Sequence, residues 1–300
     1  MHIPVLLQEC LSALSPHSGE FFVDGTLGAG GHALEVLERT QPGGIFLGLD
    51  KDPSAVENFQ SLITGKYYAL EKVLVKNASY GSLGKVLESE NLPKVDGLLL
   101  DLGFSSEQIK GGKLAGRGFS FSVDEPLLMT YDPKDPPLRD VLPTLSEEEL
   151  IQIIQDYGEE RYGKEIAKAV SKEAKAGKIQ TSINLVRAIE SAVPSNYENH
   201  RISPATRTFQ ALRIYINQEL AELEKILKAL PNIINKNGRV AIISFHSLED
   251  RLVKNYFRDY CHASSALATP IAKKPIIAAN QEINQNPRSR SAKLRAIKFN

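Results

Sequence analysis

The sequence predicts an α/β fold in which a doubly wound, mainly parallel sheet is interrupted by an inserted helical domain. Three observations support this. Short apolar runs ending in an acid alternate with helix patterns in the first third, helix patterns without strands fill the middle, and a buried strand pattern returns near the C-terminus. The chain of 300 residues is long enough for both parts.

The expected strands of the first third cover residues 21–24, 45–50, 68–75 and 95–101. The last is an almost continuous apolar run, which is typical of a parallel strand covered on both faces. Repeated βα units of this length imply right-handed crossovers and therefore a doubly wound sheet.

The strand–helix alternation stops after Asp101. Residues 102–143 are rich in Gly, Pro, Ser and Asp, and a loop this long inside a compact domain is usually functional. Helices are expected at 146–157, 163–176 and 182–193, the first with a capping box of Ser146 and Glu149. We therefore expect core residues 1–108, an insertion at 109–202 for substrate recognition, and the rest of the core at 203–300.

The second part of the core begins with a long predicted helix. Ser203 and Pro204 would start it, Pro231 would stop it, and an apolar stripe runs along it. A buried strand at 239–245 and a helix at 248–260 follow. Residues 264–285 read as irregular, and 293–299 as a final edge or hairpin strand.

Composition excludes several classes of protein. The 36 basic and 36 acidic residues give no net charge, so the chain is not a generic polyanion binder, although a local basic patch remains compatible. The two cysteines, Cys10 and Cys261, are far apart and indicate neither a disulfide framework nor a metal site. No apolar run is long enough to span a bilayer, and the first residues lack signal-peptide features, so we expect a cytoplasmic protein without membrane partners.

The stretch from Phe21 to His32 has the order strand, glycine-rich loop and helix start, which presents backbone N–H groups to a ligand. Gly28-x-Gly30-x-x-Ala33 fits the dinucleotide pattern, which alone is a weak signal. Three acids, Asp24, Asp50 and Asp101, end strands and should meet at one edge of the sheet.

The position of Asp24 bears on the identity of the ligand. A carboxylate beside the glycines would repel a pyrophosphate, whereas it suits the sulfonium and amino groups of S-adenosylmethionine. Asp50 suits the two hydroxyls of a ribose. A methyl donor is therefore favoured over NAD, and an NAD-dependent oxidoreductase is the alternative.

Motifs beyond the loop resemble one family. They include Asp24-Gly25-Thr26-Leu27-Gly28-Ala29-Gly30-Gly31-His32, Leu99-Leu100-Asp101-Leu102-Gly103-Phe104-Ser105-Ser106, Pro204-Ala205-Thr206-Arg207-Thr208-Phe209-Gln210 and Ile243-Ser244-Phe245-His246-Ser247-Leu248-Glu249. In these the chain resembles the RsmH (MraW) family of bacterial 16S rRNA cytosine-N4 methyltransferases. The resemblance implies a Rossmann-like class I methyltransferase core that uses S-adenosylmethionine. It also implies methylation of the N4 amine of a decoding-site (P-site) cytidine in the small (30S) ribosomal subunit.

The resemblance also implies a donor site. Asp50 would hold the ribose, Tyr80 would lie beside the adenine, and Asp101 and Gln108 would complete the pocket. The expected cofactor-binding residues are thus Asp24, Gly28, Gly30, Gly31, His32, Asp50, Tyr80, Asp101 and Gln108. The chain departs from the usual family pattern at Leu128 and Thr130, where an acid and an arginine are common.

Methylation of an exocyclic amine needs an unstacked base and an acceptor for the amino protons. Asp101 or nearby backbone carbonyls could accept them, and Phe104 could stack on the base or simply pack in its loop. His246 could position the base or a phosphate, or could be structural.

Contact with the expected partner, 16S rRNA or the 30S subunit, must come from local charge, because the chain has no net charge. The candidate RNA-binding residues are Arg117, Arg207, Arg213, Arg288 and Arg290. A non-catalytic RNA-binding module is a third alternative, disfavoured by the intact glycine loop, Asp50 and Asp101. Monomer and homodimer both remain open.

Overall fold

The computed structural model describes residues 3–103, 115–262 and 266–300, in which the chain divides into two compact units. The core unit comprises Met1–Ser105 and Leu220–Asn300, and the insertion comprises Ser106–Glu219. The insertion is thus a compact unit of its own between two parts of the core in the sequence.

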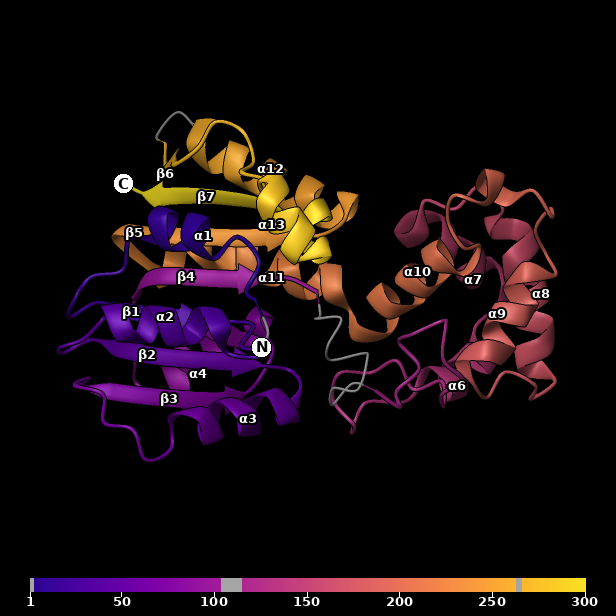
Figure 1. Ribbon diagram of the computed structural model, residues 1–300, viewed down its shortest axis with the longest axis horizontal. Coiled ribbons are helices and arrows are strands. Elements are labelled where there is room, and N and C mark those ends of the chain that lie inside the picture. The colour runs from indigo at the N-terminus through magenta and orange to yellow at the C-terminus, as the bar shows by residue number, and fades with distance from the viewer. Residues whose placement is uncertain (1–2, 104–114, 263–265) are drawn as a thin grey trace. The chain divides into compact units, whose positions relative to one another are not determined.

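The core unit contains a sheet and the helices that cover it (Figure 1). Its strands are β1 (Phe21–Asp24), β2 (Ile45–Asp50), β3 (Lys72–Asn77), β4 (Val95–Asp101), β5 (Ile234–Ser244), β6 (Ala268–Pro270) and β7 (Lys293–Phe299). Its helices are α1 (Leu7–Leu14), α2 (Gly31–Arg39), α3 (Pro53–Ile63), α4 (Leu83–Ser89), α11 (Glu219–Ile233), α12 (Ser247–His262) and α13 (Asn280–Gln285), with 3-10 turns η1 (Tyr80–Ser82) and η4 (Pro287–Ser291).

The strands form one sheet in the order β3-β2-β1-β4-β5-β7-β6. Strands β1 to β5 are parallel, and β7 pairs antiparallel with both β5 and β6. The chain moves outward from β1 to β3 and then returns to β4 and β5, so the order reverses beside β1. This is the predicted doubly wound sheet, and its switch point lies where ligands bind in such folds.

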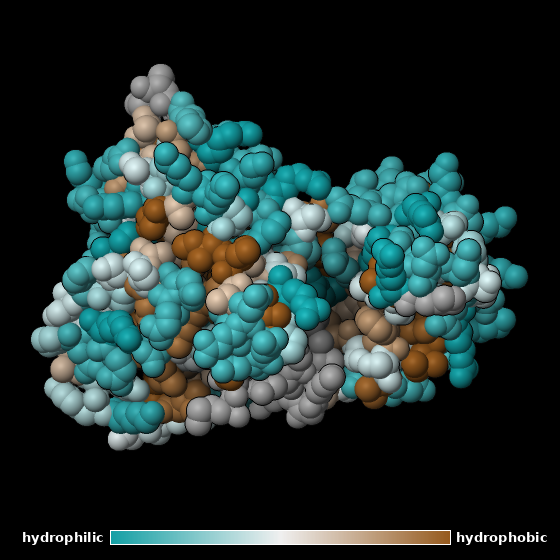
Figure 2. Space-filling model, turned by 45° about the horizontal axis from the view of Figure 1, so that its top comes forward, coloured by the Kyte–Doolittle hydropathy of each residue, from teal (hydrophilic) through white to brown (hydrophobic). Residues whose placement is uncertain are grey.

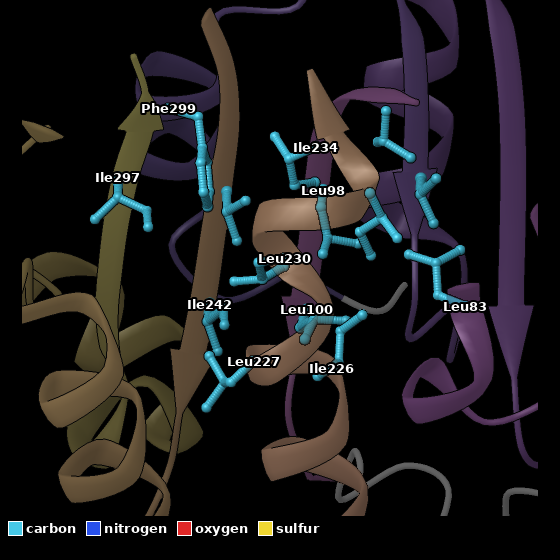
Figure 3. Close-up of a cluster of buried hydrophobic side chains, with 14 of the residues drawn as sticks. Leu83, Leu98, Leu100, Ile226, Leu227, Leu230, Ile234, Ile242, Ile297 and Phe299 are labelled. Atoms are coloured by element: carbon cyan, nitrogen blue, oxygen red, sulfur yellow. The ribbon is translucent and has the colours of Figure 1, made fainter. Parts of the chain in front are cut away.

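Side chains of successive strand residues pack on opposite faces of the sheet. Leu98 and Leu100 of β4 face a cluster with α4, α11 and α12, where Figure 3 shows Ile226, Leu227 and Leu230 of α11. Leu99 faces the other cluster, with α1, α2 and α3. Both faces are covered by helices, which explains why β4 is almost continuously apolar.

The insertion is helical. It contains α6 (Leu138–Val141), η2 (Leu142–Thr144), α7 (Glu147–Gly158), α8 (Gly163–Lys175), α9 (Ser182–Glu190), η3 (Tyr197–His200) and α10 (Ala205–Asn217). The predicted capping box is present, because the Glu149 backbone N–H donates to Ser146 Oγ and the Ser146 N–H donates to the Glu149 carboxylate. Helix α7 packs against both α8 and α10, and α8 packs against α9 (Figure 1).

The long helix expected from Ser203 to Pro231 is two helices, so that prediction was wrong. Gln218 has a φ of 55°, in the left-handed region, and ends α10 before α11 begins at Glu219. Pro231 lies inside α11. Because α10 packs on α7, it belongs to the insertion, which ends at Glu219 and not at the expected residue 202.

Smaller differences concern element bounds. Strand β3 starts at Lys72 and not at Tyr68, because Ala69 and Glu71 bond to the turn at Gln41–Gly44. Strand β7 lies between β5 and β6 and is not an edge strand. The segment expected to be irregular contains β6 and α13.

Hydrophilic residues cover most of the face shown in Figure 2, where hydrophobic residues form small groups. Among the described helices, none combines the length and the apolar character required to cross a bilayer.

Candidate active site

Three carboxyl groups end neighbouring strands of the core. Asp24 ends β1, Asp50 ends β2 and Asp101 ends β4, and parallel pairing brings these ends to one edge, as predicted. Burial raises the pKa of Asp24 and of Asp50 to about 6, and that of Asp101 to about 7. A cation bound at this edge would stabilise the ionised carboxylates.

The loop after β1 is held by these same acids. Asp24 Oδ1 accepts a hydrogen bond from the Thr26 N–H at 2.9 Å, and Thr26 Oγ1 accepts one from the Asp101 N–H at 2.7 Å. Asp50 accepts from the N–H groups of Gly28 and Asp52, each at 2.8 Å. The loop therefore connects the ends of three strands. Thr26, which sequence reasoning did not single out, binds the loop to the end of β4 through the Asp101 N–H.

The loop requires glycine at different positions for different structural reasons. A Cβ on Gly30 would lie 2.6 Å from Phe59, and one on Gly31 would lie 2.4 Å from Pro4, so both positions are closely packed. Gly28 also has a positive φ, of 49°, but a Cβ there would meet only the Thr26 carbonyl oxygen, at 4.0 Å. Among the described residues, the space beside Gly28 is open to an approaching ligand.

His32, at the start of α2, is buried and lies between the N-terminal segment and Asp101. Its Nε2 is 3.0 Å from the Val5 carbonyl oxygen, to which it can donate, and its Nδ1 lies 3.7 Å from Asp101 Oδ2. Burial lowers the pKa of His32, which favours the neutral ring. The neighbouring Leu6 N–H donates to Glu282, and Asn286 donates to the Ile3 carbonyl, so the C-terminal region holds this segment.

Asp101 has a carboxylate oxygen whose hydrogen-bonding capacity is unused within the described part of the chain. Its Oδ1 is buried and has no hydrogen-bond partner among the described residues. The positive charge of Arg288 partly opposes the effect of burial on the Asp101 pKa, whereas Glu249 adds to it. An oxygen in this state is suited to accept a hydrogen bond from a bound ligand.

The loop after β5 brings His246 to the same edge, as predicted, because β5 runs parallel to β4. Glu249, which sequence reasoning missed, holds this loop: its Oε2 accepts from the N–H groups of Phe245 and His246, at 2.8 and 3.3 Å. Its Oε1 lies 3.2 Å from His246 Nε2. A Glu three residues after a helix-capping position was the available sequence signal.

The MraW methylase family model matches residues 1–300. Ribosomal RNA small subunit methyltransferase H of Geotalea uraniireducens (strain Rf4) is 42% identical, over 98% of this chain and 97% of its own. The protein of the same name from Deinococcus radiodurans is 41% identical, over 98% and 88%.

This chain belongs to the MraW methylase family. The family is one of S-adenosylmethionine-dependent methyltransferases, so the methyl-donor interpretation of the loop, and not the NAD alternative, agrees with it. Among solved structures, an rRNA methylase from Streptococcus thermophilus is similar at a TM-score of 0.43 and 10% identity, over 100% of this chain and 98% of that one.

Of the remaining expected site residues, Tyr80 lies within the described part of the chain, whereas Phe104 and Gln108 do not. Tyr80 begins η1 beside Gly25, since its Cβ lies 3.1 Å from where a Gly25 Cβ would be. Phe104 and Gln108 lie outside the described residues, so their expected roles remain predictions.

Three of the expected RNA-binding arginines have partners within the insertion. Arg117 donates to the carbonyl oxygens of Thr130 and Tyr131, in the segment where Leu128 and Thr130 depart from the family pattern. Arg213 donates to Glu219 at 2.9 Å.

Arg207 has a set of partners on η3 and on the buried Glu160. It donates to Glu198 at 2.9 Å and to the Tyr197 hydroxyl at 3.3 Å, and it lies 3.6 Å from the Glu160 carboxylate. These contacts give the insertion arginines a structural role that the sequence patterns did not indicate.

The two C-terminal arginines are in the core. The Arg288 guanidinium lies over the Phe245 ring, 5.4 Å from its centre, and Arg290 is exposed. Of the expected RNA-binding residues, Arg288 is the one whose charge reaches Asp101.

Proposed function

We propose that this protein transfers a methyl group from S-adenosylmethionine to the N4 amine of a decoding-site cytidine in small-subunit rRNA. Its membership of the MraW methylase family and the names of its relatives support the reaction class and the rRNA substrate. The single observation that carries the chemistry is the buried Asp101 Oδ1, which lacks a partner among the described residues.

The residues present fit the methyl donor. The carboxyl groups of Asp24 and Asp101 offer negative charge to its sulfonium and amino groups, and the open space beside Gly28 lets the ligand approach the backbone. The Asp50 carboxylate lies at the end of β2 and accepts from the N–H groups of Gly28 and Asp52. Its oxygens could also accept hydrogen bonds from the hydroxyls of a ribose.

S-adenosylmethionine supplies the methyl group when bound. In our proposal, Asp101 accepts a hydrogen bond from the cytosine amine and so orients its lone pair toward that methyl group. The new N–C bond would form as the S–CH₃ bond of the donor breaks and S-adenosylhomocysteine leaves. The amine must lose one proton in this step, and a carboxylate with a pKa near 7 can accept it at neutral pH. The bond between the Asp101 N–H and Thr26 keeps this carboxylate in place.

The test uses small subunits from a bacterial strain that lacks its own enzyme of this family. Incubation with the purified protein and S-adenosylmethionine labelled on the methyl group should produce N4-methylcytidine, identified by mass spectrometry of the nucleosides. Label in another nucleoside would overturn the proposed specificity, and absence of label from both subunits and naked rRNA would overturn the proposed substrate.

A further inference from the structure

The insertion contains a groove between α8 and α9 that the sequence motifs do not predict. These helices pack side by side (Figure 1), and the groove along them has a volume of about 580 Å³. Its charged lining consists of the cations Lys168, Lys172, Lys178 and Arg187 and the acids Glu165 and Glu173.

The cations that line this groove exceed the acids by two, four against two. Lys178 pairs with Glu173 at 3.2 Å, but Lys168, Lys172 and Arg187 have no ion pair or hydrogen bond from their side chains among the described residues. All three are exposed. The groove therefore offers three cationic groups to a ligand, in a chain whose total charge is zero.

Helix geometry explains how these cations come together. The buried face of α8 includes Ile166, Val170 and Ala174, so Lys168 and Lys172, four residues apart, lie together on the exposed side. Two like charges at this spacing repel each other weakly. An anion held between them would remove that repulsion.

The groove also has apolar lining, from Ala169, Ile179, Ala188 and Ala192. Cations above an apolar floor match a sugar–phosphate chain, in which charged phosphates alternate with less polar ribose faces. A small anion would need only one or two of the cations, whereas the three are distributed over two helices.

We infer that the α8–α9 groove binds the phosphate backbone of the substrate RNA, at nucleotides other than the one that carries the reacting base. This rests on the proposed function for the identity of the RNA. Because phosphate contacts carry no sequence information, the groove sets the position and strength of binding, and base selection belongs to the methyl-transfer site.

The test replaces the three unpaired cations together, as Lys168→Gln, Lys172→Gln and Arg187→Gln. Binding to naked small-subunit rRNA is measured over a range of salt concentrations. The affinity should fall about tenfold or more near physiological salt, and the slope of log affinity against log salt should become shallower by about 2–3, since each phosphate contact contributes roughly 0.7–0.9. S-adenosylmethionine binding, measured by calorimetry, should not change.

A matched control removes three exposed cations of the core unit, Lys66→Gln, Lys85→Gln and Lys236→Gln, for the same change in net charge. It should keep most of the RNA affinity. A charge-preserving variant, Lys168→Arg, Lys172→Arg and Arg187→Lys, should bind RNA like the unaltered protein, and its melting temperature and that of the glutamine variant should match the parent.

The outcomes separate this inference from the proposed function. Unchanged RNA affinity and salt slope in the glutamine variant overturn the groove assignment, even if methylation proceeds normally. An equal loss in the control variant also overturns it, because net charge alone would then explain binding. If the protein methylates no RNA but the groove variant alone loses RNA binding, the proposed function fails and the groove assignment stands.

Discussion

The Nδ1 atom of His32 lies 3.7 Å from Oδ2 of Asp101, while Nε2 of the same ring lies 3.0 Å from the Val5 carbonyl oxygen. With Nε2 donating to Val5, the neutral ring presents an Nδ1 lone pair toward the carboxyl group. His32 therefore leaves Asp101 without a donor on that side. The Asp101 carboxyl group keeps the acceptor capacity that the proposed reaction uses.

Replacing Asp101 by Asn should abolish most of the proposed transfer. An amide has the same shape, but it cannot accept the amine proton, and general-base contributions are typically about 10²–10⁴-fold. We expect kcat to fall by at least about 100-fold, with S-adenosylmethionine affinity reduced much less. Single-turnover transfer and calorimetry measure the two effects, and full turnover by the variant would exclude Asp101 as the acceptor.

The same substitution should change the dependence of stability on pH. Because burial raises the pKa of Asp101 from 3.8 to about 7, the folded protein holds a proton that the unfolded chain releases, so its stability falls as pH rises between these values. Asp101→Asn removes this penalty. Its stability relative to the parent should be about 2.5–3 kcal/mol more favourable at pH 8 than at pH 5. The folded pKa lies about two units above pH 5, and each unit corresponds to about 1.4 kcal/mol.

Urea unfolding at the two pH values, without ligand, measures this difference. Asp259→Asn, at an exposed position of α12, is the control and should show no such pH-dependent gain. An equal relative stability of the Asp101 variant at both pH values would show that this carboxyl group does not titrate in the range given.

Gly31→Ala should weaken donor binding through the N-terminal segment. The added Cβ would lie 2.4 Å from Pro4 Cγ, so Pro4 must move, and with it the neighbouring Val5 carbonyl that His32 contacts. We expect at least a fivefold loss of S-adenosylmethionine affinity by calorimetry. Gly84→Ala in α4 is matched, because its Cβ would meet only Ile233, at 3.8 Å, and it should bind normally. Normal binding by both variants would contradict this role for Pro4.

Arg207→Gln should destabilise the insertion more than it weakens RNA binding. Glu160 is buried, and Arg207 supplies the positive charge near its carboxylate, with Tyr197 as a further partner. Loss of one member of such a network costs about 1–3 kcal/mol. Thermal unfolding should show this loss, whereas Arg290→Gln, at an exposed residue, should leave the melting temperature unchanged. A stable Arg207 variant with impaired RNA binding would favour the direct RNA contact instead.

Gln218→Gly should stabilise the protein, because glycine adopts the φ of 55° at this position without the penalty of a Cβ. The Cβ penalty of about 1–2 kcal/mol in this conformation exceeds the entropy that glycine costs, so we expect a net gain of about 0.5–1 kcal/mol in chemical unfolding. A β-branched residue there, as in Gln218→Val, should have the opposite effect. If both substitutions were neutral, the left-handed break between α10 and α11 would not be a fixed feature of the chain.

The sheet could be predicted well because its signals are local. The bounds of β1, β2 and β4 follow directly from apolar runs that end in Asp24, Asp50 and Asp101. The same runs predicted that the three acids would meet at one edge. The helix break could not be predicted, since glutamine carries no preference for a left-handed backbone and the apolar stripe continues through it.

The site contacts that sequence reasoning missed are long-range or depend on orientation. Nothing local relates Thr26 to the Asp101 N–H, seventy-five residues away, or His32 to the Val5 carbonyl. The arginines of the insertion were expected to contact RNA because their charge is visible in the sequence. Their carboxylate and carbonyl partners within the protein could not be seen there. A basic residue can be assigned to an RNA contact only when its neighbours in the folded structure are known.

The bonds from Leu6 to Glu282 and from Asn286 to Ile3 have a consequence for synthesis of the protein. On the ribosome, the first residues emerge long before the segment that holds them. Helix α13 and strand β7 follow the insertion in the chain, so the contacts that hold the first residues form only after residues 106–219 have been synthesised. The segment that carries Pro4 and the Val5 carbonyl is therefore held in place only after the rest of the core has been made.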